Sequence, residues 1–291
     1  MKHDYITLED QQERIEDSEV VSEGIIDPTQ RTKLFVLGSC EMTRLIDNFT
    51  NLCNEITLET TTIKGNHRIV NVGTEYIRSC FDMTMEEKKF CSRYFYNYTS
   101  EGVFKTKLFD ETFDYVILSF SDDFIYTLNK KKDDNNLRII RDDEYVFGGN
   151  YNILCIDEQD KWLQEHFNNT SFIDEERFYQ NLQWIRNKLD SSTILILLTG
   201  PEYNFYRLST LRSERCNPYI RNQIIKLNQV IKRFTDENPN NVGLVDVNKS
   251  LKTISDFTDY IFHWTTKKSY EIAKECLILM AQKKAKRKKT T

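Results

Sequence analysis

The residues best suited to chemistry follow an apolar run near the start of the chain. This run, Leu34 to Leu37, leads directly into Gly38-Ser39-Cys40. A thiol attacks an electrophile only as a thiolate, and the N–H groups at a helix amino terminus lower the pKa of a thiol placed there. A histidine within hydrogen-bond reach can take the thiol proton and later return it to a leaving group. Cys40, with Ser39 beside it, is therefore the first candidate nucleophile, and His263 is the candidate base.

The residues around Cys40 must place it at the edge of a sheet. The run from Leu34 to Leu37 has no polar alternation, which predicts a strand buried on both faces of a parallel sheet. Open α/β sheets bind ligands at the carboxyl ends of their strands. Arg44, one turn after Cys40, shares its helix face and could lower the thiol pKa or hold an anionic sugar or phosphate. The helix itself is predicted from apolar residues at three- and four-residue spacing: Leu45, Phe49, Leu52, Cys53 and Ile56.

The rest of the chain alternates between strand and helix patterns. Four further buried strands are expected, over Arg68–Val72, Asp114–Phe120, Thr193–Thr199 and Val242–Val247. Helical stripes are expected over Phe178–Leu189, Ile220–Phe234 and Tyr270–Met280. This alternation predicts an α/β fold with a five-stranded, doubly wound parallel sheet and helices on both faces. In architectural terms we expect a flavodoxin-like three-layer α/β/α sandwich.

Three regions of the chain are expected. Residues 1–31 form an acidic N-terminal extension, residues 32–281 one α/β domain, and residues 282–291 a basic C-terminal tail. The domain carries a long irregular insertion over residues 124–175, which is typical of either a functional lid or a disordered loop. A basic tail is usually solvated and disordered, and the alternative is contact with an anionic membrane or an acidic polymer.

Composition excludes several classes of function. The net charge of −5 gives no general case for a nucleic-acid partner. The sequence has no apolar stretch of membrane-spanning length and no leader pattern, so we expect a cytoplasmic protein or one peripheral to the membrane. Seven cysteines without a paired framework fit a reducing compartment. Neither the four histidines nor the cysteines have metal-ligand spacing, and no glycine-rich phosphate loop is present. We therefore expect no metal and no required cofactor.

The order of motifs along the chain resembles a known superfamily. A nucleophile after the first strand, with an acid and a histidine before the last helix, resembles the SGNH (GDSL-like) hydrolases. Leu37-Gly38-Ser39-Cys40 followed by Thr43-Arg44 looks like the GSC-motif branch of that superfamily. This branch includes the GSCFA and WcbI-type proteins of bacterial surface-polysaccharide biosynthesis.

The resemblance implies a role for each matching residue. Cys40 falls where the superfamily has its nucleophile, with Ser39 at the position before it. His263 matches the general base, and Asp259 matches the acid that orients it. The remaining roles that it implies are an oxyanion hole from Cys40, Gly73 and Ser121, and substrate contacts from Arg44 and Asp122.

The function implied is that of an SGNH-like acyl hydrolase or acyltransferase, either an esterase or an acetyltransferase-like enzyme. Its partner would be a carbohydrate: a bacterial surface (capsule) polysaccharide or its sugar precursor. Acyl-CoA is a plausible acyl donor, because exchange between a thiol and a thioester is nearly isoenergetic. The alternative is a non-catalytic binding or assembly protein of the same fold. Two departures favour it: Asp259 and His263 are four residues apart rather than three, and the asparagine of the third motif is missing.

Each candidate also has a purely structural interpretation. Cys40 could be a small buried residue, and His263 a packed core histidine between two aromatic neighbours. Asp259 could cap the last helix, a role that Thr265 or Thr266 could also fill. Asp246 could be a second acid or a loop cap, with the cap favoured, and Asp122 and Asp123 could be ordinary turn residues.

Overall fold

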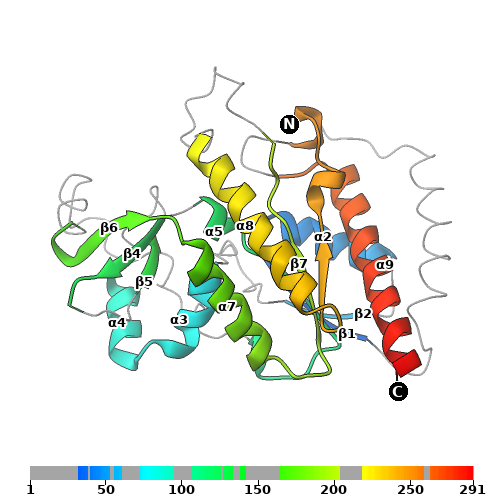
Figure 1. The fold of residues 1–291 in the computed structure, drawn as a ribbon, viewed down its shortest axis with the longest axis horizontal. Helices are drawn as coiled ribbons and strands as arrows, with labels where there is room; N and C mark the ends of the chain where they lie inside the picture. The colour runs from blue at the N-terminus through cyan, green and yellow to red at the C-terminus, as the bar shows by residue number, and fades with distance from the viewer. Residues whose placement is uncertain are drawn as a thin grey trace.

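A parallel sheet forms the core of the fold (Figure 1). Its strands are β1 (Thr32–Leu37), β2 (Ile56–Thr60), β3 (Tyr115–Ser119), β7 (Ile194–Leu198) and β8 (Val242–Val245). Their order is β2-β1-β3-β7-β8, and every neighbouring pair is parallel. Every residue of β3 and β7 is buried, because helices cover a parallel sheet on both faces. This burial explains the uninterrupted apolar runs in the sequence.

The structure is a computed structural model that describes most of the α/β domain. The described residues are 32–38, 40–52, 56–60, 73–94, 107–125, 127–133, 138–141, 164–203, 218–258 and 263–290. Among them, no helix is both long enough and apolar enough to cross a bilayer.

Four of the helices in the described residues pack in two pairs. The helices are α2 (Cys40–Leu52), α3 (Thr74–Asp82), α4 (Met85–Tyr94), α5 (Ser121–Ile125), α7 (Glu175–Lys188), α8 (Pro218–Glu237) and α9 (Thr266–Thr290). Helix α7 packs against α8, and α2 packs against α9. In Figure 1, α8 lies in front of β7 and α2 lies behind it. Both pairs bury apolar faces, such as Ile224, Leu227 and Ile231 of α8 and Leu45 and Phe49 of α2.

A second, smaller sheet lies within the expected insertion. Its strands are β4 (Thr127–Lys131), β5 (Arg138–Arg141) and β6 (Phe167–Ser171). They pair antiparallel in the order β5-β4-β6 and lie beside α3 and α7 in Figure 1. The described part of residues 124–175 is therefore ordered structure rather than an irregular loop.

The α/β class and four of the five expected strands are confirmed. The runs at Leu34–Leu37, Asp114–Phe120, Thr193–Thr199 and Val242–Val247 form β1, β3, β7 and β8. The fifth, Arg68–Val72, lies outside the described residues. Instead, Ile56–Thr60 pairs with β1, so the expected continuation of the first helix to Ile56 is wrong. Ile56-Thr57-Leu58-Glu59-Thr60 alternates apolar and polar residues and is rich in β-branched side chains, which favours a strand.

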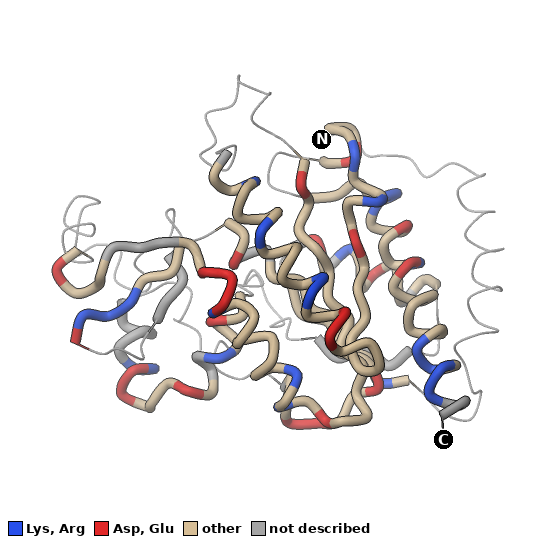
Figure 2. Tube along the Cα trace, in the orientation of Figure 1, with Lys and Arg blue, Asp and Glu red and all other residues tan. Residues whose placement is uncertain are grey.

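The basic end of the chain is helical. Helix α9 runs to Thr290 and ends in a cluster of lysine and arginine (Figure 2). Lys283 Nζ donates hydrogen bonds to the carbonyls of Pro239 at 2.5 Å and Val242 at 2.6 Å, and Arg287 donates one to Asn241 Oδ1 at 2.8 Å. The expected disordered tail is therefore wrong for residues 282–290, because these side chains anchor the helix to the loop before β8. Contact with an anionic membrane stays a prediction.

Candidate functional site

The candidate site lies where the chain reverses direction across the sheet. From β1 the chain passes to β2 on one side and later to β3 on the other, so the strand order switches between β1 and β3. Open α/β sheets bind ligands in the crevice outside such a switch point. A hydrogen bond spans it here: Ser119 Oγ at the end of β3 donates to Glu41 Oε1 at the start of α2, at 3.2 Å. Both side chains are buried.

Gly38 fixes the turn that leads to Cys40. A Cβ atom at Gly38 would lie 2.1 Å from Met42 Cγ and 3.1 Å from Ser119 Cβ. A larger residue at position 38 would therefore force Met42, and to a lesser extent Ser119, to move. Cys40 is the first residue of α2, which places it at the carboxyl edge of the sheet as predicted. Its side chain, and Ser39 as a whole, lie outside the described part of the chain, so their chemical roles stay predictions.

The segment before α9 brings His263 to the same edge. The backbone carbonyl of His263 accepts a hydrogen bond from the backbone N–H of Thr258 at 2.8 Å, and Phe257 forms an antiparallel bridge with Trp264. Arg44 Nη1 donates a hydrogen bond to the carbonyl of Trp264. The half-buried His263 therefore belongs to a segment that is bonded directly to α2, the helix that begins at Cys40. Asp259, its expected orienting acid, lies outside the described residues.

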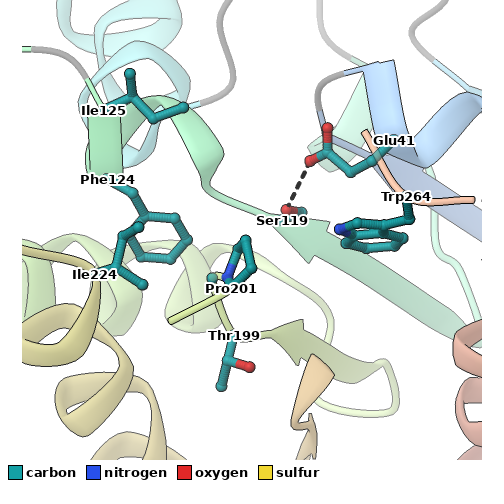
Figure 3. A pocket seen from close by; sticks show the side chains of 9 residues that line it. Glu41, Ser119, Phe124, Ile125, Thr199, Pro201, Ile224 and Trp264 are labelled. Atoms are coloured by element: carbon teal, nitrogen blue, oxygen red, sulfur yellow. Dashed lines mark hydrogen bonds between the residues drawn. The ribbon is translucent and has the colours of Figure 1, made fainter. Parts of the chain in front are cut away.

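A pocket lies between these two segments (Figure 3). Glu41, the residue after Cys40, and Trp264, the residue after His263, both line it. The free volume inside it is about 10 Å³, which is room for about one water molecule. The other lining residues come from β3, α5, the end of β7 and α8: Ser119, Phe124, Ile125, Thr199, Gly200, Pro201 and Ile224. The pocket is therefore largely apolar, and its polar groups are the side chains of Glu41, Ser119 and Thr199 and the indole N–H of Trp264.

The expected oxyanion region is occupied in part by an acid. Gly73 is buried and directly precedes α3, and Asp123 Oδ2 accepts a hydrogen bond from the N–H of Thr74 at 2.6 Å. Burial raises the pKa of Asp123 to about 7, and the charge of Glu75 adds to the rise, although the hydrogen bonds from Thr74 lower it. Asp123 is therefore a buried cap of α3 and not an ordinary turn residue.

Ser121 and Asp122 are the first two residues of helix α5, and Asp123 follows them directly. Their side chains lie outside what the structure describes, so the expected oxyanion role of Ser121 and substrate contact of Asp122 stay predictions.

A polar network surrounds the start of α3 nearby. Asn181 Nδ2 donates to Thr74 Oγ1 and to Glu75 Oε1, both at 3.1 Å, and Arg177 forms an ion pair with Glu75.

A separate polar network joins the segments that follow β7 and β8. Asp246 accepts hydrogen bonds from Thr199 Oγ1 at 3.0 Å and from the N–H of Asn248 at 3.3 Å, and lies 3.3 Å from Lys232 Nζ. Burial raises the pKa of Asp246, but the hydrogen bonds and Lys232 outweigh it, so the net pKa is lowered. The interpretation of Asp246 as a loop cap is confirmed. The side chain of Glu202 accepts a hydrogen bond from Asn228, at 2.9 Å.

No metal centre emerges from the described ranges, in which no three His, Cys, Asp or Glu side chains gather. Comparisons of the chain with protein-family models, with curated proteins and with solved structures find no match. The function of the site is therefore inferred from its own geometry and motifs.

Proposed function

We propose that the protein is an SGNH-like acyl hydrolase or acyltransferase in which Cys40 is the nucleophile and His263 the general base. One observation carries this proposal. The sequence neighbours of the two residues, Glu41 and Trp264, line the same pocket, and Arg44 is bonded to Trp264. The segments that carry Cys40 and His263 therefore meet, although more than two hundred residues separate them in the sequence, and this supports the proposed pair.

The topology supports this proposal. The order β2-β1-β3-β7-β8 follows the flavodoxin-like pattern, in which ligands bind at the switch point between the first and third strands. Cys40 follows β1 directly, and Glu41 is bonded to Ser119 across that switch point. The fold and the pocket thus both support a site at this edge of the sheet. We also propose that the fold is the flavodoxin-like three-layer α/β/α sandwich of this superfamily.

The proposed reaction proceeds in two balanced steps. His263 takes the proton of Cys40, and the thiolate attacks the acyl carbonyl to form a C–S bond. The bond to the leaving group breaks, and His263 gives that group its proton. A water or a sugar hydroxyl then attacks the thioester, His263 removes its proton, and the thiol of Cys40 is restored. Asp259 would orient His263, and the N–H groups of Cys40 and Gly73 would bind the oxyanion, at about 3 kcal/mol for each donor.

The substrate class follows from the resemblance. We propose that the acyl acceptor or ester is a bacterial surface polysaccharide or its sugar precursor, with acyl-CoA as the donor in the transfer reaction. Arg44 and Asp122 are the proposed polar contacts to the sugar. Assay of acetyl-CoA thioesterase activity, with and without sugar acceptors, would separate hydrolysis from transfer.

The decisive experiment is the pH dependence of Cys40 alkylation by iodoacetamide, resolved by peptide mapping. We expect rapid reaction with an apparent pKa well below ~8.5, and a slower reaction in His263→Ala. His166→Ala is the matched control, because His166 directly precedes β6 of the second sheet. A slow Cys40 that is indifferent to the loss of His263 would refute the proposed pair.

One observation favours the non-catalytic alternative. Asp123 places a carboxyl group at the start of α3, beside the expected oxyanion hole, where its ionised form would repel an oxyanion. A binding or assembly protein has no need of that hole. Under this alternative, Cys40→Ala would leave glycan binding unchanged and wild-type protein would show no turnover. Loss of turnover in folded Cys40→Ala would reject it.

A further inference from the structure

The last turns of α9 carry a dense positive charge. Residues 283–289, here called the basic end of α9, contain six lysine and arginine side chains and no acid. These charges act on one another and on a neighbouring helix. Burial lowers the pKa of Lys283, and the charges of Lys286 and Arg287 lower it further. Burial also lowers the pKa of Arg186 of α7, and the charge of Arg287 adds to this effect. A negatively charged partner would relieve the repulsion.

The basic end of α9 lies at the edge where the strands of the parallel sheet begin. Arg287 donates hydrogen bonds to the carbonyl of Ser192, just before β7, and to Asn241 Oδ1, directly before β8. The hydroxyl of Tyr115, the first residue of β3, donates a hydrogen bond to the carbonyl of Met280 at 3.1 Å. Because the neighbouring strands are parallel, β1 begins at this edge too.

Residues 1–31 join the sheet at the same edge. They lie outside the described residues and lead into Thr32, the first residue of β1. β1 is the neighbour of β3, and Leu34 pairs with Tyr115, so Thr32 lies two residues beyond the start of β3. Neighbouring strands are ~4.8 Å apart, and each residue of a chain can span ~3.3 Å. A small part of residues 1–31 is therefore enough to reach the basic end of α9.

The charges of the two segments match in sign and in size. Residues 1–31 carry nine acidic and three basic side chains, a net charge of −6 with His3 neutral, and the basic end of α9 carries +6. Two acids described at this edge already accept backbone hydrogen bonds: Asp114 from Lys33 and Asp190 from Ser192, each at 2.7 Å. A segment of the same chain also has an effective concentration on the order of mM, which favours it over a free anionic partner.

We propose that residues 1–31 bind the basic end of α9 by charge attraction and cover it from other anionic partners. The attraction is shared among many solvent-screened charges, so it weakens as the salt concentration rises. An anionic membrane or an acidic polymer can then bind the basic end only by displacing residues 1–31. This inference does not rest on the proposed function, because it involves neither Cys40 nor His263.

The inference is tested by the rate at which trypsin cleaves the full chain after Arg14, read by mass spectrometry. Each rate is divided by that of a synthetic peptide of residues 1–31, which removes the effect of salt on trypsin itself. Cleavage follows the unbound fraction when release is fast. At about 0.1 M salt we expect cleavage about tenfold slower than in the peptide, which corresponds to ~1.4 kcal/mol. At about 1 M salt, where charges are screened beyond ~3 Å, the two rates should be equal.

Charge reversal in α9 tests the binding surface. Lys284→Glu combined with Lys286→Glu should raise the rate at low salt to that of the peptide. Lys88→Glu combined with Lys89→Glu is the matched control, because it makes the same change of charge on α4, which lies away from α9 (Figure 1). The control should keep the protection. Urea unfolding of both variants would verify that the fold is retained.

A second variant tests the acidic partner. Glu19→Gln combined with Glu23→Gln should also speed cleavage after Arg14, measured against a peptide with the same changes. Protection that survives either charge variant, or about 1 M salt, would overturn the inference. Protection that grows with protein concentration would also overturn it and indicate contact between two copies. Cleavage at the rate of the peptide in low salt, with binding to phosphatidylserine vesicles that the α9 variant abolishes, would assign the basic end to an anionic membrane instead.

Discussion

Arg44 donates a hydrogen bond from its guanidinium to the backbone carbonyl of Trp264, across 220 residues of sequence. This bond joins the first turns of α2 to the segment that enters α9. The two helices also pack against each other along the edge of the core. The relative positions of Cys40 and His263 therefore depend on an interaction that neither residue makes.

Replacing Arg44 by alanine should separate the two halves of the site. A hydrogen bond to a charged donor contributes about 1.5–3 kcal/mol, so unfolding in urea should show a loss of up to that size. The rate of Cys40 alkylation should also lose its dependence on His263. Arg44→Lys is the matched variant, since its ammonium can still donate to the carbonyl, and it should recover part of both effects. An alanine variant in which His263 still governs Cys40 would contradict this link.

Gly38→Ala should disturb the turn that carries Cys40. The new methyl group would lie 2.1 Å from Met42 Cγ, and Met42 is itself 1% exposed. Overpacking of this kind costs about 1–3 kcal/mol, which urea unfolding would measure. Because the shortest contact is with Met42 Cγ, Met42→Ala in the same chain should relieve part of the clash, and the double-mutant cycle should show coupling. Strict additivity of the two changes would mean that Met42 is not the residue that resists the methyl group.

Asp123 should make stability fall as the pH rises. Its folded pKa of about 7 is raised from the ordinary 3.8, mainly by burial, so the folded state holds a proton that the unfolded state has lost between those values. The free energy of unfolding therefore decreases across this window, by up to about 4 kcal/mol in all. Unfolding in urea at pH 5 and at pH 8 would measure the part of this decrease that lies above pH 5, about 2–3 kcal/mol.

Two substitutions separate the charge of Asp123 from its capping role. Asp123→Asn keeps an oxygen for the N–H of Thr74 but cannot ionise, so it should flatten the pH dependence and gain relative stability at pH 8. Asp123→Ala also cannot ionise but removes the cap of α3, so it should be about 1 kcal/mol or more less stable than Asp123→Asn at both pH values. Equal pH dependence in wild type and Asp123→Asn would assign the titration to another group.

Cys276 should remain unlabelled when native protein is alkylated. It is fully buried in α9, and burial raises the pKa of its thiol far above the ordinary value, with the charge of Glu275 adding to the rise. A neutral, inaccessible thiol does not react with iodoacetamide. Denaturant should expose it, so its labelling reports global unfolding in the same experiment that measures Cys40. Labelling of Cys276 as fast as Cys40 in native buffer would indicate local opening of α9.

The sequence predicts the main elements of the fold because burial leaves a strong pattern. β3 and β7 have no polar residue facing solvent, and the stripe from Ile220 to Phe234 repeats with the period of a helix. β2 is missed because Ile56 fits the end of the preceding helical stripe as well as the start of a strand. The length of α9 is missed because hydrogen bonds from Lys283 and Arg287 to a distant loop leave no local signal.

The location of the site is predictable, but its pocket is not. The abrupt end of an apolar run at Gly38 marks the sheet edge, and the first residue of α2 follows directly. From the sequence alone, Glu41 is only a favourable acid in the first turn of a helix, and Trp264 is only a core residue beside His263. Their shared pocket depends on β3, β7, α5 and α8 meeting at one point, which spacing within any single segment does not encode.

Lys283→Ala should destabilise the junction between α9 and the sheet. Its ammonium donates to the carbonyls of Pro239 and Val242, and burial, together with the charges of Lys286 and Arg287, lowers its pKa. Loss of both hydrogen bonds leaves two carbonyls without this donor, at a cost of about 1–2 kcal/mol in urea unfolding. Lys286→Ala removes the same charge from an exposed side chain and should leave the unfolding midpoint nearly unchanged. Equal losses in the two variants would mean that net charge, and not the bonds of Lys283, holds the end of α9 in place.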